Sequence, residues 1–390
     1  MSFDADVAII GGGPAGSSTA LHLVRRDGIA PSRLVLFERA VHPREKPCAG
    51  AVSAWGLRAL ARIGVSLDVS HVRIRGLRVL AAAATGAHEA DLGVVVRRCE
   101  FDASLWRRAA SDGVVVHDGE PVVGLAAIAG GWRVTTSRRT VDARFVAACD
   151  GAGSVARKLL GLGEPARRGH LYVTETPATP NDRGPQTGLC DFDLRVAENG
   201  IEGYYWDFPT LLDGAPAVSR GIYHANFTPR SDLKTRLSDA LAIRGIDIAH
   251  VRLQPFSTRP FVRGSRLALH RLVLVGEAAG IDATTGEGIA QAILTGGIAA
   301  RRLSHALRTG HGSMDRYAHD VGQSRVGRHM LQSAWLATRV YGARGTRWRT
   351  FLAGTPAACR AGASWYAGDS LGWTTKAHLA ASLMVELARA

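Results

Sequence analysis

The sequence of 390 residues has little cysteine and no long hydrophobic run. Its five cysteines show no paired short spacing, which argues against a CxxC redox pair or zinc knuckles and favours reduced thiols. No uninterrupted apolar stretch reaches the roughly 18 residues that a membrane-spanning helix needs. The first residues also lack the basic start and apolar core of a secretory signal. We therefore expect a cytoplasmic protein without a metal site.

Lysine is also scarce, because it accounts for only four of the 48 basic residues, and the formal net charge is +14. An arginine-biased genome explains this balance. The alternative is a basic face that meets an anionic membrane surface peripherally or an acidic substrate. No nucleic-acid-binding motif accompanies the charge, so we expect no nucleic-acid partner. The sequence leaves the oligomeric state open.

An apolar strand near Asp6–Ile10 runs into a glycine-rich turn that opens a helix pattern. The turn reads Gly11-Gly12-Gly13-Pro14-Ala15-Gly16. Gly11 permits the tight turn, Gly13 lets backbone N–H groups approach a pyrophosphate, and Gly16 lets the helix pack closely on the sheet. Glu38 closes the next strand, where an acid accepts hydrogen bonds from a ribose diol. This βαβ pattern predicts a dinucleotide site.

Two later segments are also rich in glycine. Residues 149–157 follow a buried strand and contain Asp150; read alone, they pass as a second finger for a nicotinamide dinucleotide. Residues 276–289 follow another buried strand and open a long helix. In residues 276–289 an oxygen acceptor can hold a ribityl chain, and the N-terminus of the helix can face developing negative charge on a reduced flavin ring.

These three segments, in this order and spacing, resemble the GxGxxG, DG and GD fingerprints of FAD-dependent oxidoreductases with the para-hydroxybenzoate hydroxylase fold. Residues 98–102 resemble the RxxFD segment of that family, whose arginine contacts FAD. Residues 46–50 (Lys-Pro-Cys-Ala-Gly) resemble the KPCGG stretch of the geranylgeranyl reductase branch, and residues 204–209 match its YxWxFP motif. The likeness spans about residues 5–300. Glu277 departs from it, since it replaces the usual aspartate.

The glycine pattern and the resemblance together predict an FAD site. We expect the cofactor to be bound by Gly11, Gly13, Pro14, Ala15, Gly16, Glu38, Arg39, Cys48, Ala49, Arg98, Asp150, Gly276, Glu277, Gly286, Gly288 and Ile289. The resemblance implies catalytic roles for Cys48, Tyr204 and Trp206. Alternation along one strand places Tyr204, Trp206 and Phe208 on one face, as an aromatic wall for substrate. The alternatives are ordinary sheet core for the aromatic residues and a small packing thiol for Cys48.

The expected fold class is α/β, with a Rossmann-like FAD-binding domain, an inserted antiparallel sheet for substrate and a helical C-terminal region. Residues 1–168 are predicted as the first part of the FAD-binding domain, 169–262 as the antiparallel platform, 263–307 as the second part of the domain, and 308–390 as the helical region. Within the first part we expect a β-meander made of Val114–Val116, Val122–Ala127 and Trp132–Thr136.

Several reactions suit such a protein, because one fold hosts many chemistries. The KPCAG and YxWxFP segments favour reduction of a C=C bond in a small lipophilic substrate, isoprenoid-like or a secondary metabolite, by hydride from reduced FAD. The alternatives are a flavin monooxygenase, a flavin-dependent halogenase and a flavoprotein that only carries electrons. NAD(P)H or a separate reductase would supply the electrons.

Overall fold

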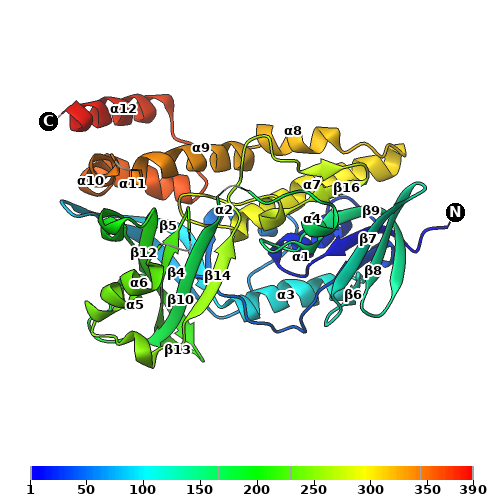
Figure 1. Cartoon of the computed structure of the whole chain (residues 1–390), viewed down its shortest axis with the longest axis horizontal. Coiled ribbons are helices and arrows are strands. Elements are labelled where there is room, and N and C mark those ends of the chain that lie inside the picture. Colours follow the sequence, from blue (N-terminus) through cyan, green and yellow to red (C-terminus); the bar gives the residue numbers. More distant parts are fainter. Residues whose placement is uncertain (1, 166, 229–230, 343, 389–390) are drawn as a thin grey trace.

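The computed structural model describes residues 2–165, 167–228, 231–342 and 344–388. Two β-sheets lie next to each other, with helices packed on both, and the C-terminal helices run along one side of the molecule (Figure 1). The expected fold class is confirmed: a parallel α/β sheet carries the glycine turns, and a largely antiparallel sheet and a helical C-terminal region accompany it.

The first sheet is parallel at its centre, where β1 pairs with β2 on one side and with β9 on the other. All four residues of β2 are buried, as are five of the six in β1. Such apolar runs are typical of parallel strands covered on both faces. In spatial order its strands are β15 (Ala268–Leu269), β16 (Leu272–Leu274), β9 (Thr140–Ala148), β1 (Ala5–Ile10), β2 (Leu34–Phe37) and β6 (Val115–His117).

The predicted β-meander is wrong in one strand. Residues Val114–Val116 were expected in it, but β6 pairs in parallel with β2 instead. The antiparallel meander consists of β7 (Val122–Ile128), β8 (Gly131–Thr136) and β9. A short apolar run does not reveal its partner, because the crossover through α3 (Arg98–Ser111) decides where the strand lands.

Helix α1 (Pro14–Arg25) follows β1 directly and packs against α3 and against α7 (Ile289–Thr309). Proline suits the first position of a helix, because it lacks an N–H and an N–H at that position would have no intrahelical partner. Helix α7 also contacts α2 (Ala54–Ala61), and α4 (Val155–Leu159) lies against β7. Four short 3₁₀ segments connect other elements: η1 (Pro31–Arg33), η2 (Leu194–Asn199), η3 (Ile248–His250) and η4 (Gly276–Ala278).

The second sheet draws its strands from two separate parts of the chain. Its spatial order is β14 (Gln254–Thr258), β10 (Gly169–Pro177), β13 (Ala215–His224), β12 (Gly203–Leu212), β11 (Leu189–Asp193), β4 (His71–Leu80), β5 (Thr85–Val96) and β3 (Ala51–Ser53). Strands β3, β4 and β5 precede residue 168, whereas the other strands follow it. Parallel pairing of β4 with β11 joins the two groups.

Helices cover both faces of this second sheet. Tyr205 packs with α6 (Leu233–Ala242) on one face, whereas Trp206 packs with residues of the C-terminal helices on the other. These helices lie along the second sheet in Figure 1. The remaining helices are α5 (Arg183–Thr187), α8 (Asp315–Gln323), α9 (Arg325–Val340), α10 (Gly345–Gly354), α11 (Pro356–Tyr366) and α12 (Trp373–Ala388). Within the described residues, no helix combines the length and apolarity needed to cross a membrane.

Candidate functional site

A cleft of about 550 Å³ opens where the parallel strands of the first sheet end. Ligands of open α/β sheets bind outside the carboxyl ends of the strands. Most of the predicted cofactor residues line this cleft: Gly11, Gly13, Pro14, Ala15, Glu38, Arg39, Cys48, Arg98, Asp150, Glu277, Gly286, Gly288 and Ile289. Residues far apart in the sequence therefore meet in one place.

The first glycine turn has room for backbone only. Gly11 has a φ of +102°, and a Cβ on it would lie 2.5 Å from the carbonyl oxygen of Cys149. Gly16 is outside the lining, and its Cβ would lie 1.9 Å from the carbonyl oxygen of Gly11. No side chain caps the N-terminus of α1, whose N-cap is Gly13, and no acid lies in its first turn. The helix end is thus open to an anionic group.

Glu38 sits at the end of β2 and is only 6% exposed. The backbone N–H of Gly12 donates to its Oε2 at 2.8 Å, and the N–H of Ala40 donates to its Oε1 at 3.1 Å. These bonds fix the carboxylate at the cleft and leave lone pairs for another donor. Such a fixed acceptor is what a ribose diol needs.

The charges around the cleft are closely balanced. Arg98 donates from Nε and Nη2 to the two carboxylate oxygens of Asp102, at 2.8 and 2.7 Å. Burial alone would raise the pKa of Asp102, but the Arg98 guanidinium outweighs it and holds that pKa below its usual range. Arg44 bridges Asp102 at 3.3 Å and Glu38 at 3.5 Å. Each of these two arginines therefore has a carboxylate partner.

Asp150 presents an unsatisfied oxygen. Its Oδ2 accepts from the N–H of Ala156 at 2.9 Å, whereas its buried Oδ1 has no partner among the described residues. Burial raises the pKa of Asp150. On the other side of the cleft, the Nζ of Lys46 lies 3.3 Å from Oε2 of Glu277 and 4.6 Å from the ring centre of Phe256.

The third glycine segment ends at the N-terminus of α7. No side chain caps this helix, whose N-cap is Gly288. Gly286 has a φ of +67°, and a Cβ there would come within 3.2 Å of the Tyr223 ring. Gly276 has a φ of +61° and does not line the cleft; a Cβ on it would lie 2.7 Å from the side chain of Ala15. These glycines bring two backbone turns up to the cleft and to α1.

Known proteins fit this geometry. Residues 4–182 match the family described as FAD binding domain. This chain is an FAD-dependent oxidoreductase. It is 26% identical to geranylgeranyl diphosphate reductase of Arabidopsis thaliana over 79% of this chain and 68% of the relative. It is 27% identical to menaquinone reductase of Mycobacterium tuberculosis over 78% of each chain. The resemblance to the geranylgeranyl reductase branch is thereby confirmed.

Solved structures share the fold. A geranylgeranyl bacteriochlorophyll reductase-like protein from Thermoplasma acidophilum superposes with a TM-score of 0.74 at 21% identity, over 98% of this chain and 96% of that one. A p-nitrophenol 4-monooxygenase from Pseudomonas putida superposes with a TM-score of 0.71 at 17% identity, over 95% of this chain and all of that one.

The cleft of the flavoprotein suits FAD. The open N-terminus of α1 fits a pyrophosphate and Glu38 fits a ribose, while the free Oδ1 of Asp150 can accept a hydrogen bond from a hydroxyl of the ribityl chain. The open N-terminus of α7 fits the end of the flavin ring where negative charge develops.

Cys48 lines the cleft, and its Sγ accepts from the N–H of Gly50 at 3.4 Å. Ala49 follows it but is outside the lining. The three aromatic residues of β12 lie elsewhere. Tyr204, Trp206 and Phe208 are 4%, 2% and 3% exposed and pack in the core beneath the C-terminal helices.

Sequence reasoning missed three charged residues of this flavin site. Arg44 and Asp102 form the ion pairs described above, and the partly buried Glu287 lies between Gly286 and Gly288, which line the cleft. The N–H of Ser53 donates to Glu287 at 3.3 Å and the amide of Gln291 at 3.2 Å. Burial raises the pKa of Glu287 to about 7. Asp102 carried a signal, because it is the final residue of the RxxFD segment.

Proposed function

We propose that the protein reduces a C=C bond of a small lipophilic substrate at the end of the cleft nearest α7. The observation that carries this proposal is a junction between the two sheets. The hydroxyl of Tyr204, on the aromatic strand β12, donates to the carbonyl oxygen of Thr285 at 2.5 Å. The glycine turn that would receive the flavin ring is thereby bonded to the most aromatic strand of the second sheet.

The names of the two reductase relatives support the same reaction class, because geranylgeranyl chains and menaquinone are lipophilic and contain C=C bonds. The KPCAG and YxWxFP segments support it as well, since they resemble the geranylgeranyl reductase branch. Binding energy for such a substrate comes mainly from removal of apolar surface from water.

When bound, FAD supplies the hydride and accepts electrons from a donor; the protein supplies binding and orientation. Glu38, Asp150 and the N-terminus of α1 would hold the dinucleotide. The N-terminus of α7 would stabilise negative charge that develops on the flavin ring. Cys48 lies in the wall of the cleft. Burial raises the pKa of Tyr204 and keeps its hydroxyl protonated as the donor to Thr285.

The same fold occurs in the monooxygenase described above, so oxygen chemistry is the second candidate. A halogenase requires a free catalytic amine beside the substrate. Lys46, the one lysine near the cleft among the described residues, lies next to Glu277, which argues against that role.

Anaerobic turnover tests the proposal. The purified protein is reduced with dithionite and mixed without oxygen with geranylgeranyl diphosphate or menaquinone-4 in separate experiments. We expect the yellow absorbance of oxidised flavin to return in step with formation of a product that is still two hydrogens heavier after air has reoxidised any quinol to the quinone. Reoxidation that requires air and gives an oxygenated product would contradict the proposal.

A matched pair of glycine variants ties turnover to the bound flavin. Gly11→Ala places a Cβ 2.5 Å from a backbone oxygen, so we expect a protein that retains no flavin and has no activity. Gly322→Ala lies on helix α8, where a Cβ meets nothing within 4 Å, and this variant should retain both the flavin and the activity.

A further inference from the structure

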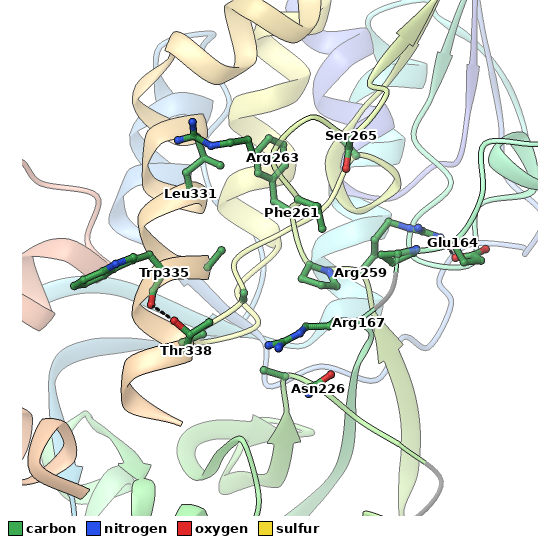
Figure 2. A pocket seen from close by; sticks show the side chains of 18 of the residues that line it. Glu164, Arg167, Asn226, Arg259, Phe261, Arg263, Ser265, Leu331, Trp335 and Thr338 are labelled. Carbon is green, nitrogen blue, oxygen red and sulfur yellow. Dashed lines mark hydrogen bonds and ion pairs between the residues drawn. The ribbon is translucent and has the colours of Figure 1, made fainter. Parts of the chain in front are cut away.

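A second cavity, of about 800 Å³, lies on the other side of the segment that carries the third glycine motif. We call it the arginine pocket, because Arg157, Arg167, Arg259, Arg263 and Arg266 line it. Figure 2 shows it between helix α9 and the loop after β14. The two cavities share their dividing segments: Thr258 and Ile281 line the flavin cleft, whereas the nearby Arg259 and Ala279 line the arginine pocket.

Two of these arginines are buried although they line a cavity. Arg157 is 7% exposed and Arg259 is 4% exposed, and the Nε of each has no hydrogen-bond partner among the described residues. Arg157 donates to the carbonyl oxygens of Leu162 at 2.8 Å and Gly163 at 3.1 Å. Burial lowers the pKa of Arg157, and the neighbouring positive charge of Arg259 lowers it further. Two buried like charges with free donors are costly unless an anion meets them.

The acids of the pocket do not balance this charge. Glu164 pairs with Arg259 at 2.5 Å, but it also pairs with Arg168 at 2.5 Å. The other acid in the lining, Glu202, accepts a hydrogen bond from the Asn226 side chain at 3.1 Å. Five arginines and two glutamates line the described part of the pocket, so positive charge is in excess.

The opposite wall is apolar. Phe261 is buried at the base, and Leu331 and Trp335 project from α9. The Trp335 side chain is 51% exposed; its ring also packs edge-on against Trp348 and carries the Arg339 guanidinium 4.6 Å from its centre. In Figure 2, Arg167 extends from the loop of Glu164 toward the helix that carries Trp335. Cationic and apolar surfaces thus face the same space.

We propose that the arginine pocket binds an anionic amphiphile, separate from the flavin site and independent of the reaction proposed above. Its phosphate or carboxylate head lies against Arg157 and Arg259, with Arg167 closing over it. Its apolar chain lies along Phe261, Leu331 and Trp335. Guanidinium groups suit this head, because they donate bidentate hydrogen bonds to phosphate and carboxylate oxygens.

Binding of dodecyl phosphate to the FAD-loaded protein, below the concentration at which it forms micelles, tests this proposal. Isothermal titration calorimetry should show saturable binding to the unchanged protein. We expect Arg167→Glu and Trp335→Ser each to weaken it about tenfold, which corresponds to the loss of one favourable contact. Both positions are exposed, so the variants should fold and stay yellow. Arg138→Glu, an equal charge change at an exposed position outside the pocket, should bind as the unchanged protein does.

Two further probes separate the sources of the ligand. Inorganic phosphate should bind much more weakly than dodecyl phosphate; equal affinity would contradict the role of the apolar wall. Vesicles of phosphatidylglycerol, compared with phosphatidylcholine, test a membrane lipid as the source. Vesicle binding that requires Arg167 and Trp335 assigns the ligand to a membrane, and binding of the monomer alone assigns it to solution. Binding that is equal in all variants, or absent with every probe, would overturn the proposal whatever the reductase assay gives.

Discussion

The flavin cleft and the arginine pocket hold their arginines in opposite ways. In the flavin cleft, Arg98 forms a two-point bond with buried Asp102, and Arg44 lies between two carboxylates. In the arginine pocket, Arg157 contacts only carbonyl oxygens, and Arg259 shares its carboxylate with another arginine. A charge that is already paired positions its neighbours, whereas an unpaired one is ready to bind an anion. The comparison indicates that the arginines at the cleft mainly shape it and those of the pocket recognise a ligand.

The largest expected effect on stability comes from removing one charge of the buried Arg98–Asp102 pair at the cleft. Asp102→Ala would leave Arg98 buried without its partner, as Arg157 already is. Breaking a buried pair in this way costs about 3–5 kcal/mol of unfolding free energy. Urea denaturation of the FAD-free protein would measure it.

A double variant serves as the control. Replacing both partners, Arg98→Met with Asp102→Leu, removes the charges together and should recover most of that stability. If the double variant is as unstable as Asp102→Ala, the pair does not act through its charge balance.

An intermediate effect is expected for Glu287, the partly buried acid between the cleft-lining residues Gly286 and Gly288. Its pKa is raised from an ordinary 4.5 to about 7, so the folded protein holds its proton more tightly than the unfolded chain does. This contribution to stability is therefore complete below about pH 4.5 and is lost as the pH rises through about 7. Glu287→Gln keeps a neutral group, and we expect it to be more stable than the unchanged protein by about 3 kcal/mol at about pH 8.

Thermal unfolding across this pH range provides the measurement. The difference between Glu287→Gln and the unchanged protein should shrink to nothing toward about pH 4.5. A difference that does not depend on pH would show that Glu287 does not titrate in this range.

The smallest effect is expected where water screens the charges. Arg133 forms a two-point bond with Asp142, at 2.8 Å for both contacts, but its side chain is 51% exposed. Exposed pairs of this kind contribute little. Arg133→Gln should leave the melting temperature unchanged within error, although its bond geometry matches that of Arg98. A clear loss of stability would mean that geometry, rather than burial, separates the two pairs.

The sequence allowed the flavin cleft to be predicted because its signals are local. Gly11 and Gly16 indicate a turn with no room for any other side chain at these two positions, and Glu38 follows at the end of the next strand. A chain segment of about 30 residues contains the whole unit. The order of the two later glycine segments along the chain allowed the remaining wall of the cleft to be predicted.

Features that depend on distant pairing could not be predicted in the same way. The strand β6 was expected in the meander but lies beside β2, and β3–β5 joined the second sheet. The arginine pocket combines residues near positions 160, 260 and 335. No periodicity links those segments. Because arginine is abundant throughout the chain, the sequence does not distinguish the few arginines that are buried there.

The aromatic face of β12 also bears on how the chain is made. Its cover comes from residues of α9 and α11, such as Tyr366, which lie more than a hundred positions later in the sequence. Chains emerge from the ribosome N-terminus first, at about 5–20 residues per second. The second sheet is therefore synthesised well before its cover, and Trp206 stays in contact with solvent or a chaperone for several seconds in every newborn molecule.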